Sequence, residues 1–272
     1  MDTILKELNL DKAMTREDAA SNREVIAKLV AAGPKAVEHL VNRLADNGDP
    51  TAQVALHAMA FAVGAPGKEE HLKGFVDALA AQLQRDLPQG TKYFLIEQLQ
   101  LTGGRQAVPA IAANLGENAL ADPASRALTR IGGPDAAAAL REALPKAKGR
   151  ARLSIMQALT DLGDRQSLDE FRKTAKDENR DARVLALFSL ADLGDASSTD
   201  LVLGSVDGKP RFERMQNFRA ALRLAQRLKE AGKASEAKRV YQEVLKRCTG
   251  DHESHVKQAA ARGLLMLAGG QK

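Results

Sequence analysis

A short motif that recurs along the chain restricts the folds open to it. In each copy an apolar helix end is followed by Gly, then by Gly, Asp or Pro, and then by a new apolar segment. Gly after the last helical residue is the expected C-cap, because it reaches the left-handed conformation without a steric penalty. The motif therefore predicts short helices joined by tight turns. Its copies are LVAAGPKAVEHL (29–40), LQLTGGRQAVPAI (99–111), LTRIGGPDAAAAL (128–140), LTDLGDRQSLDEF (159–171) and LADLGDASSTDLV (190–202).

A repeat frame appears when each copy is aligned on the residue just before the new helix. Residues four, seven and eleven positions beyond this anchor are apolar, as in Val37, Leu40 and Leu44, and Thr199 alone breaks the pattern. Because such spacing marks one face of a helix, it predicts a buried face on the helix after each anchor, here named helix A. The anchors, 29 to 38 residues apart, are Gly33, Lys68, Gly104, Gly133, Asp164, Asp195 and Lys233.

A second helix, named helix B, precedes each Gly. Counting back one, four and eight residues from Gly132 gives Ile131, Leu128 and Ala124, and other copies repeat this mixture of Leu and small residues. The chain is rich in Leu and Ala, which favour helices, whereas aromatic residues are only 3%. A single helix pair cannot bury its own apolar face, so the pairs must stack. We therefore predict an all-α fold, a right-handed α-α superhelix (solenoid) of about seven helix pairs.

Two stretches resemble known repeat families. The run DARVLALFSLADLGD (181–195), together with the period near 31 residues, is similar to the short bacterial HEAT repeats also found in phycobilisome lyases. This resemblance implies an armadillo-like helical fold, which serves many different functions. The later run EAGKASEAKRVYQEVL (230–245) resembles the middle of a tetratricopeptide repeat.

Three segments are predicted from these patterns. Residues 1–15 form an N-terminal segment or capping helix, residues 16–207 form the HEAT-like repeats, and residues 208–272 form a longer helical module stacked on the same solenoid. A separate domain beginning near residue 208 is the alternative. Two overlapping capping boxes, at 15–18 and 21–24, are expected to start the first repeat helix.

Charge and cysteine content exclude several classes. The net charge of +5 comes from 40 basic and 35 acidic residues, which are mostly interspersed as on ordinary solvated helices. The single Cys248 excludes an internal disulfide framework and a Cys-based zinc site. No stretch has the length of apolar sequence that spans a membrane, and the N-terminus lacks the apolar region of a signal peptide. A cytoplasmic location is the default expectation, and export is expected if the chain is an excised domain.

No catalytic site, metal site or cofactor is predicted. The most metal-like group is Asp251, His252, Glu253 and His255, but a polar loop-to-helix junction accounts for it. Deoxyhypusine hydroxylases are HEAT proteins that hold iron with several His-Glu pairs, and this chain has one such pair, at 252–253. A hydroxylase or lyase function of the HEAT type is therefore the least favoured alternative, and we expect no enzymatic activity.

Nucleic-acid binding is the stronger alternative. Some HEAT-like proteins are DNA glycosylases that hold duplex DNA in a basic concave groove. Phosphate binding needs positive charge on one face, and base chemistry also needs aromatic platforms, which are scarce here. The basic residues cluster in two places, at Lys146, Lys148, Arg150 and Arg152, and at Lys209, Arg211, Arg214, Arg219, Arg223 and Arg227.

The favoured function is a protein-binding scaffold that uses a concave surface lined by the B helices. Positions three, six and ten residues before each Gly are expected to face away from the core. A protein or peptide partner is predicted to bind there, and a homodimer through this face is an alternative. The predicted partner-binding residues are Tyr93, Glu97, Arg126, Leu153, Gln157, Val184 and Phe188, beside Gln100, Asp122, Thr129, Thr160 and Ala191.

Overall fold

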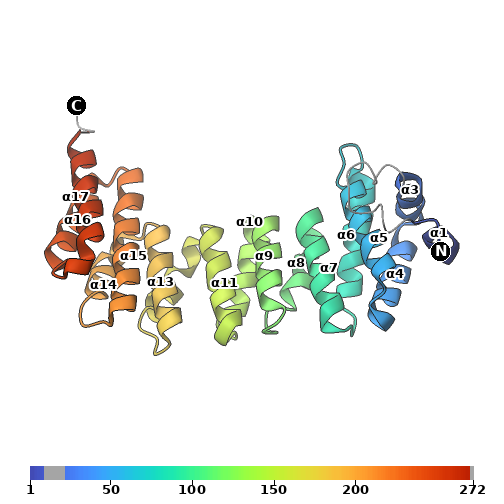
Figure 1. The fold of residues 1–272 in the computed structure, drawn as a ribbon, viewed down its shortest axis with the longest axis horizontal. Coiled ribbons are helices and arrows are strands. Elements are labelled where there is room, and N and C mark those ends of the chain that lie inside the picture. The colour runs from blue at the N-terminus through green and yellow to red at the C-terminus, as the bar shows by residue number, and fades with distance from the viewer. Residues whose placement is uncertain (9–21, 270–272) are drawn as a thin grey trace. The chain divides into compact units, whose positions relative to one another are not determined.

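The computed structural model describes residues 1–8 and 22–269, and helices make up 78% of these residues. No strand occurs within those two ranges. After α1, the described helices alternate between the A and B types along seven A–B pairs, with one further B helix before the first pair (Figure 1). The chain is therefore an all-α, HEAT-like helical repeat protein, as the sequence predicts.

The bounds of the helices follow the repeat frame closely. The A helices are α4 (Pro34–Asn47), α6 (Glu69–Leu83), α8 (Val108–Ala112), α10 (Gly133–Ala143), α12 (Leu168–Thr174), α14 (Thr199–Gly204) and α16 (Ala234–Arg247). The B helices are α3 (Arg23–Ala32), α5 (Pro50–Val63), α7 (Gln89–Thr102), α9 (Ala121–Ile131), α11 (Gly149–Asp161), α13 (Arg180–Asp192), α15 (Arg211–Glu230) and α17 (Ser254–Gly269). The short helix α1 (Asp2–Leu5) precedes them, and one 3-10 turn precedes each of α8, α12, α14 and α17.

The turns and the core confirm the predicted frame. Every anchor residue lies at or directly before the start of an A helix or its leading 3-10 turn. The A-helix positions predicted to be apolar are buried, except for Leu72 and Leu168, which are half-buried. The glycines that end the B helices adopt the positive φ expected of a C-cap, namely Gly33, Gly103, Gly132, Gly163 and Gly194.

The helices stack in two layers within each compact unit. In the N-terminal unit (Met1–Ala158), α5 packs against α3 and α7, while α6 packs against α4 and α8. In the C-terminal unit (Leu159–Lys272), α15 packs against α13 and α17, while α16 packs against α14. Small residues such as Ala124 and Ala186 are fully buried on B helices, which lets neighbouring helices approach closely.

The N-terminal predictions fall partly outside the described residues. The capping box at 15–18 and the first residue of the second box lie there, as do residues 9–15 of the segment 1–15. Within the described part, α3 follows Asn22. Helix α1 is held to α4 by Asp2, whose carboxylate accepts hydrogen bonds from His39 and Arg43. The boundary predicted at residue 208 stays a prediction.

Candidate partner-binding site

The predicted partner-binding residues divide between the two units. Five of them lie in the N-terminal unit, and Val184 and Phe188 lie on α13 in the C-terminal unit. Tyr93, Arg126 and Gln157 are exposed, as predicted. The remaining four are half-buried, namely Glu97, Leu153, Val184 and Phe188.

Two neighbouring positions contradict the predicted exposed face. Thr160 and Ala191, each three residues before a Gly, are buried. The hydroxyl of Thr160 donates a hydrogen bond to Ser189 Oγ at 2.6 Å, so this position faces the next B helix. The prediction was wrong because neighbouring helices pack against these two, α13 against α11 at Thr160 and α15 against α13.

An aromatic–arginine pair forms the centre of the exposed surface in the N-terminal unit. Arg126 Nη2 on α9 lies 3.5 Å from the hydroxyl oxygen of Tyr93 on the neighbouring helix α7. Arg126 Nη1 also lies 3.0 Å from Asp122, one helical turn earlier. Because both side chains of the pair are exposed and in contact, this surface presents a planar cation and an aromatic ring side by side.

Three exposed residues on the nearby helices α5 and α7 were not among the predicted contacts. Phe61 on α5 is 64% exposed and Leu101 on α7 is 51% exposed. His57 packs edge-on against Phe61 with ring centroids 5.0 Å apart, and its Nδ1 lies 3.0 Å from Gln98 Oε1. Leu101 stands two residues before Gly103, a position outside the three-six-ten series. We name as the B face the exposed side chains of α5, α7 and α9, namely His57, Phe61, Tyr93, Leu101 and Arg126.

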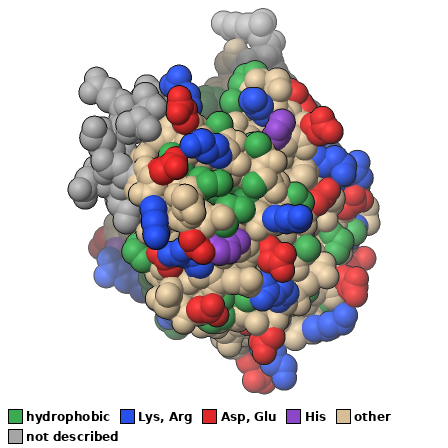
Figure 2. Space-filling view, turned by 90° about the vertical axis from the view of Figure 1, so that its right-hand side faces the viewer, with side chains coloured by type: hydrophobic (Ala, Val, Ile, Leu, Met, Phe, Trp, Pro, Cys, Tyr) green, Lys and Arg blue, Asp and Glu red, His purple; other side chains and the backbone are tan. Residues whose placement is uncertain are grey.

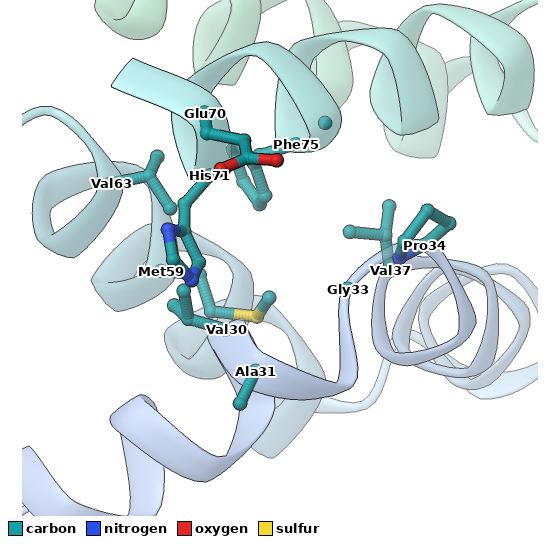
Figure 3. Close-up of a pocket in the computed structure, with 11 residues that line it drawn as sticks. Val30, Ala31, Gly33, Pro34, Val37, Met59, Val63, Glu70, His71 and Phe75 are labelled. Atoms are coloured by element: carbon teal, nitrogen blue, oxygen red, sulfur yellow. The ribbon is translucent and has the colours of Figure 1, made fainter. Parts of the chain in front are cut away.

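A cavity of about 350 Å³ lies between α3, α4, α5 and α6. Its walls are mostly apolar side chains such as Val37, Met59 and Phe75. Glu70 and His71, from the first turn of α6, lie across from Pro34 at this cavity (Figure 3). Its size suits one large apolar side chain or a small ligand. Two polar groups on consecutive residues, without a nucleophile beside them, do not form a catalytic arrangement.

Charges of both signs are mixed around this end of the molecule. Figure 2 shows Lys and Arg side chains alternating with Asp and Glu around exposed hydrophobic atoms. A phosphate-binding surface would show one sign of charge over a continuous area. The face in Figure 2 therefore lacks the continuous positive area that phosphate binding needs.

The second basic cluster is engaged inside the C-terminal unit. Arg214 Nε lies 2.6 Å from Glu253 Oε1, and its Nη1 and Nη2 donate to the carbonyls of Val206 and Arg247. Arg223 and Arg227 of the same helix both contact Asp192 of α13. These three arginines of the second basic cluster therefore connect helices and loops to one another.

The same arrangement occurs one repeat earlier. Arg183 Nη2 lies 3.0 Å from both carboxylate oxygens of Glu213, and its Nη1 donates to the carbonyls of Asp177 and Glu178. Arg183 and Arg214 are each the fourth residue of their B helix and stand 31 positions apart. This interval equals the repeat period, so the sequence contained a signal that the two arginines occupy equivalent positions.

The metal-like group at 251–255 belongs to the cluster around Arg214. The carboxylate of Glu253 accepts hydrogen bonds from the backbone N–H groups of Thr249 and Gly250 as well as from Arg214. The Arg214 guanidinium, together with these N–H groups, lowers the pKa of Glu253 to about 2 although burial opposes the shift. His252 Nε2 lies 3.9 Å from Glu253 Oε1. Glu253 therefore closes a loop, and no group of three or more potential metal ligands occurs in the described ranges.

Comparisons with known proteins bear on the fold alone. No family model matches the sequence, and no curated protein matches it. Among solved structures, an engineered protein aligns with 98% of this chain and 77% of its own, at 18% identity and a TM-score of 0.47. The complex of CpcE and CpcF of phycocyanin lyase from Nostoc sp. aligns over 84% of this chain and 94% of that chain, at 16% identity and a TM-score of 0.43. Likenesses at this level carry no argument about binding or catalysis. Among the described helices, none is long and apolar enough to span a bilayer.

Proposed function

We propose that this chain is a non-enzymatic scaffold that binds a protein or peptide partner through the B face. The observation that supports this is the exposed pair Tyr93 and Arg126 on neighbouring helices, flanked by exposed Phe61 and Leu101. Tyr and Arg are enriched among the residues that dominate binding energy at protein interfaces. Large exposed apolar side chains that gather on one surface are typical of interaction sites.

The shape of the B face favours a peptide or a helix over a small molecule. Packed helices place equivalent positions about 10 Å apart, so the exposed side chains of α5, α7 and α9 form a ridge. A partner would lie across this ridge, with its own apolar residues against Phe61 and Leu101. Asp122 and Arg126 carry opposite charges, so we expect binding to weaken only moderately with salt. Val184 and Phe188 of the C-terminal unit stay predicted contacts.

Replacing Tyr93 with Ala and Arg126 with Glu together should weaken partner binding by about tenfold or more. Both side chains are exposed, so helicity and the melting temperature should change little. The measurement is a quantitative pull-down from the native source with wild-type and variant bait, followed by titration of the captured partner.

A matched control is available in the C-terminal unit. Phe212 is 59% exposed, and the guanidinium carbon of Arg180 lies 5.3 Å from the centre of its ring. The change Phe212→Ala with Arg180→Glu removes the same two chemical groups from another surface. If this variant loses the partner while the Tyr93 and Arg126 variant keeps it, the B face is not the binding site.

Each alternative function predicts a different experimental result for this protein. Stoichiometric iron or zinc in the purified chain would support a hydroxylase-like enzyme. Tight duplex-DNA binding with a steep salt dependence would support the glycosylase-like alternative, and loss of that binding on changing Lys148 and Arg150 would locate it at the first basic cluster. The scaffold proposal requires that both results be negative.

A further inference from the structure

The terminal helix α17 buries one face and leaves the opposite face in solvent. Val256, Ala260 and Gly263 are buried, and α17 packs against α15 and α16. On the other side, Leu265 is 74% exposed and Met266 is 55% exposed. Two B helices, α13 and α17, pack against α15. Among the described helices, α15 is the only B helix that packs against α17.

The exposed residues of this face recur at helical spacing. Lys257, Ala261 and Leu265 form one row, and Arg262 and Met266 form a second row beside it. All five are exposed, and together they are named the end face. A stripe at spacings of three and four residues is the arrangement that receives an amphipathic helix.

The charge beside the end face has one sign. Helix α17 contains Lys257 and Arg262 and no Asp or Glu. Lys229 of α15 adds a third cation, with its Nζ 4.0 Å from the methionine sulfur of the end face. The nearby carboxylate of Glu230 is paired with Arg227 on its own helix. An occupant of the end face therefore meets apolar side chains bordered by positive charge.

We propose that the end face docks an amphipathic helix of a partner protein, whose apolar spine is flanked by Asp and Glu. The partner helix lies where the next B helix of the stack would lie, with its apolar residues against Leu265 and Met266. Its carboxylates face Lys229, Lys257 and Arg262, which sets its orientation and suppresses basic partners. This site does not depend on the B face.

The same charges disfavour a second copy of this chain as the occupant. If two α17 helices met through their end faces, each would bring Lys257 and Arg262 to the contact, along with Lys229 from α15. Clustered like charges destabilise such a contact. An acidic partner helix instead gains from each of these cations.

The test uses the full chain and a displayed library of amphipathic helices of about 18 residues, roughly five turns. The apolar spine is fixed, and the flanking positions vary among Asp, Glu, Lys, Arg and Ser. Selected helices are then synthesised and titrated by fluorescence anisotropy against the wild type, against Leu265→Ser with Met266→Ser, and against Arg262→Glu. The Tyr93→Ala with Arg126→Glu variant is the control for binding at the B face.

Selection is expected to return helices enriched in Asp and Glu that bind the wild type and the B-face control equally. The Leu265 and Met266 variant should bind them about tenfold more weakly or worse, and Arg262→Glu should shift the preference towards Lys-flanked helices. Circular dichroism checks that both variants stay folded. The proposal is overturned if selection returns no helix that depends on Leu265, or helices without acidic enrichment. It is also overturned if the double change instead abolishes a dimer in ultracentrifugation, or abolishes binding to phosphatidylserine vesicles.

Discussion

Replacing Glu253 with Gln is expected to lower the unfolding free energy of the C-terminal unit by about 2–4 kcal/mol. The Glu253 side chain is only 2% exposed and pairs with Arg214, which is itself largely buried. Gln retains an oxygen for the N–H groups of Thr249 and Gly250, but it cannot balance the Arg214 charge. Breaking a buried pair is costly because the remaining charge keeps its desolvation penalty. Urea unfolding followed by circular dichroism measures the loss.

A solvent-exposed pair in the same unit provides the control. Arg239 on α16 pairs with Asp200 on α14, and their side chains are 59% and 82% exposed. Asp200→Asn should change the unfolding free energy by less than about 1 kcal/mol, because water screens such pairs. If Asp200→Asn and Glu253→Gln lower the unfolding free energy equally, burial does not determine how much the Arg214–Glu253 pair contributes to stability.

The same pair predicts how stability depends on pH. Hydrogen bonding by Arg214 is the main cause that lowers the pKa of Glu253 from 4.5 to about 2 in the folded chain. A carboxyl group with a lowered pKa contributes stability that is complete above its unfolded pKa. That stability is lost as pH falls from about 4.5 towards 2, and its full size is about 3 kcal/mol. The difference in unfolding free energy between wild type and Glu253→Gln should therefore shrink across this window. A difference that stays constant from pH 6 to pH 2.5 would contradict the assignment.

The repeat frame was predictable because two local signals coincide in most repeats. A Gly with a positive φ follows α3, α7, α9, α11 and α13, and an apolar row at spacings of three and four begins after each anchor. Even Thr199, the one polar residue in that row, is buried at the predicted position and donates its hydroxyl to the carbonyl of Ala196. Period and capping therefore determined where the A helices start.

The direction in which long side chains point was not predictable in this way. Arg214 and Arg150 both appeared in basic clusters of the sequence, yet Arg214 turns inward to Glu253 while Arg150 is exposed. The choice depends on a carboxylate 39 residues away, which local periodicity does not identify. Likewise, the sequence count predicted an exposed Thr160. Its hydrogen-bond partner, the buried Ser189, lies on the next B helix, which local spacing does not identify.

The mixed outcome at the B face has the same origin. Sequence spacing placed Tyr93 and Arg126 on the exposed side, and the structure brings them into contact. Phe61 stands three residues before Gly64 and is exposed, whereas Thr160 and Ala191, at the same position of their helices, are buried. Predictions that depend on the outward side of a helix therefore need the positions of its two neighbours.

The packing of α17 on α16 leaves no room for a side chain at residue 263. The ring of Tyr241 lies directly over the Gly263 Cα, and a Cβ built there would overlap the ring carbons. Tyr241 is only 6% exposed, so the ring cannot move aside without disturbing the helix interface. Gly263→Ala is therefore expected to destabilise the C-terminal unit by about 1–3 kcal/mol, even though Ala is the better helix former.

The same substitution elsewhere should have the opposite sign. Gly74 lies inside α6 with ordinary φ and no atom near a built Cβ, so Gly74→Ala should stabilise the chain by about 0.5–1 kcal/mol through helix propensity alone. Thermal and urea unfolding of both variants make the comparison. A further variant, Tyr241→Leu, isolates the cause, because removing the ring should relieve most of the cost of Gly263→Ala. If Gly263→Ala is equally destabilising with Leu at 241, overlap with the tyrosine ring is not the reason that this position requires glycine.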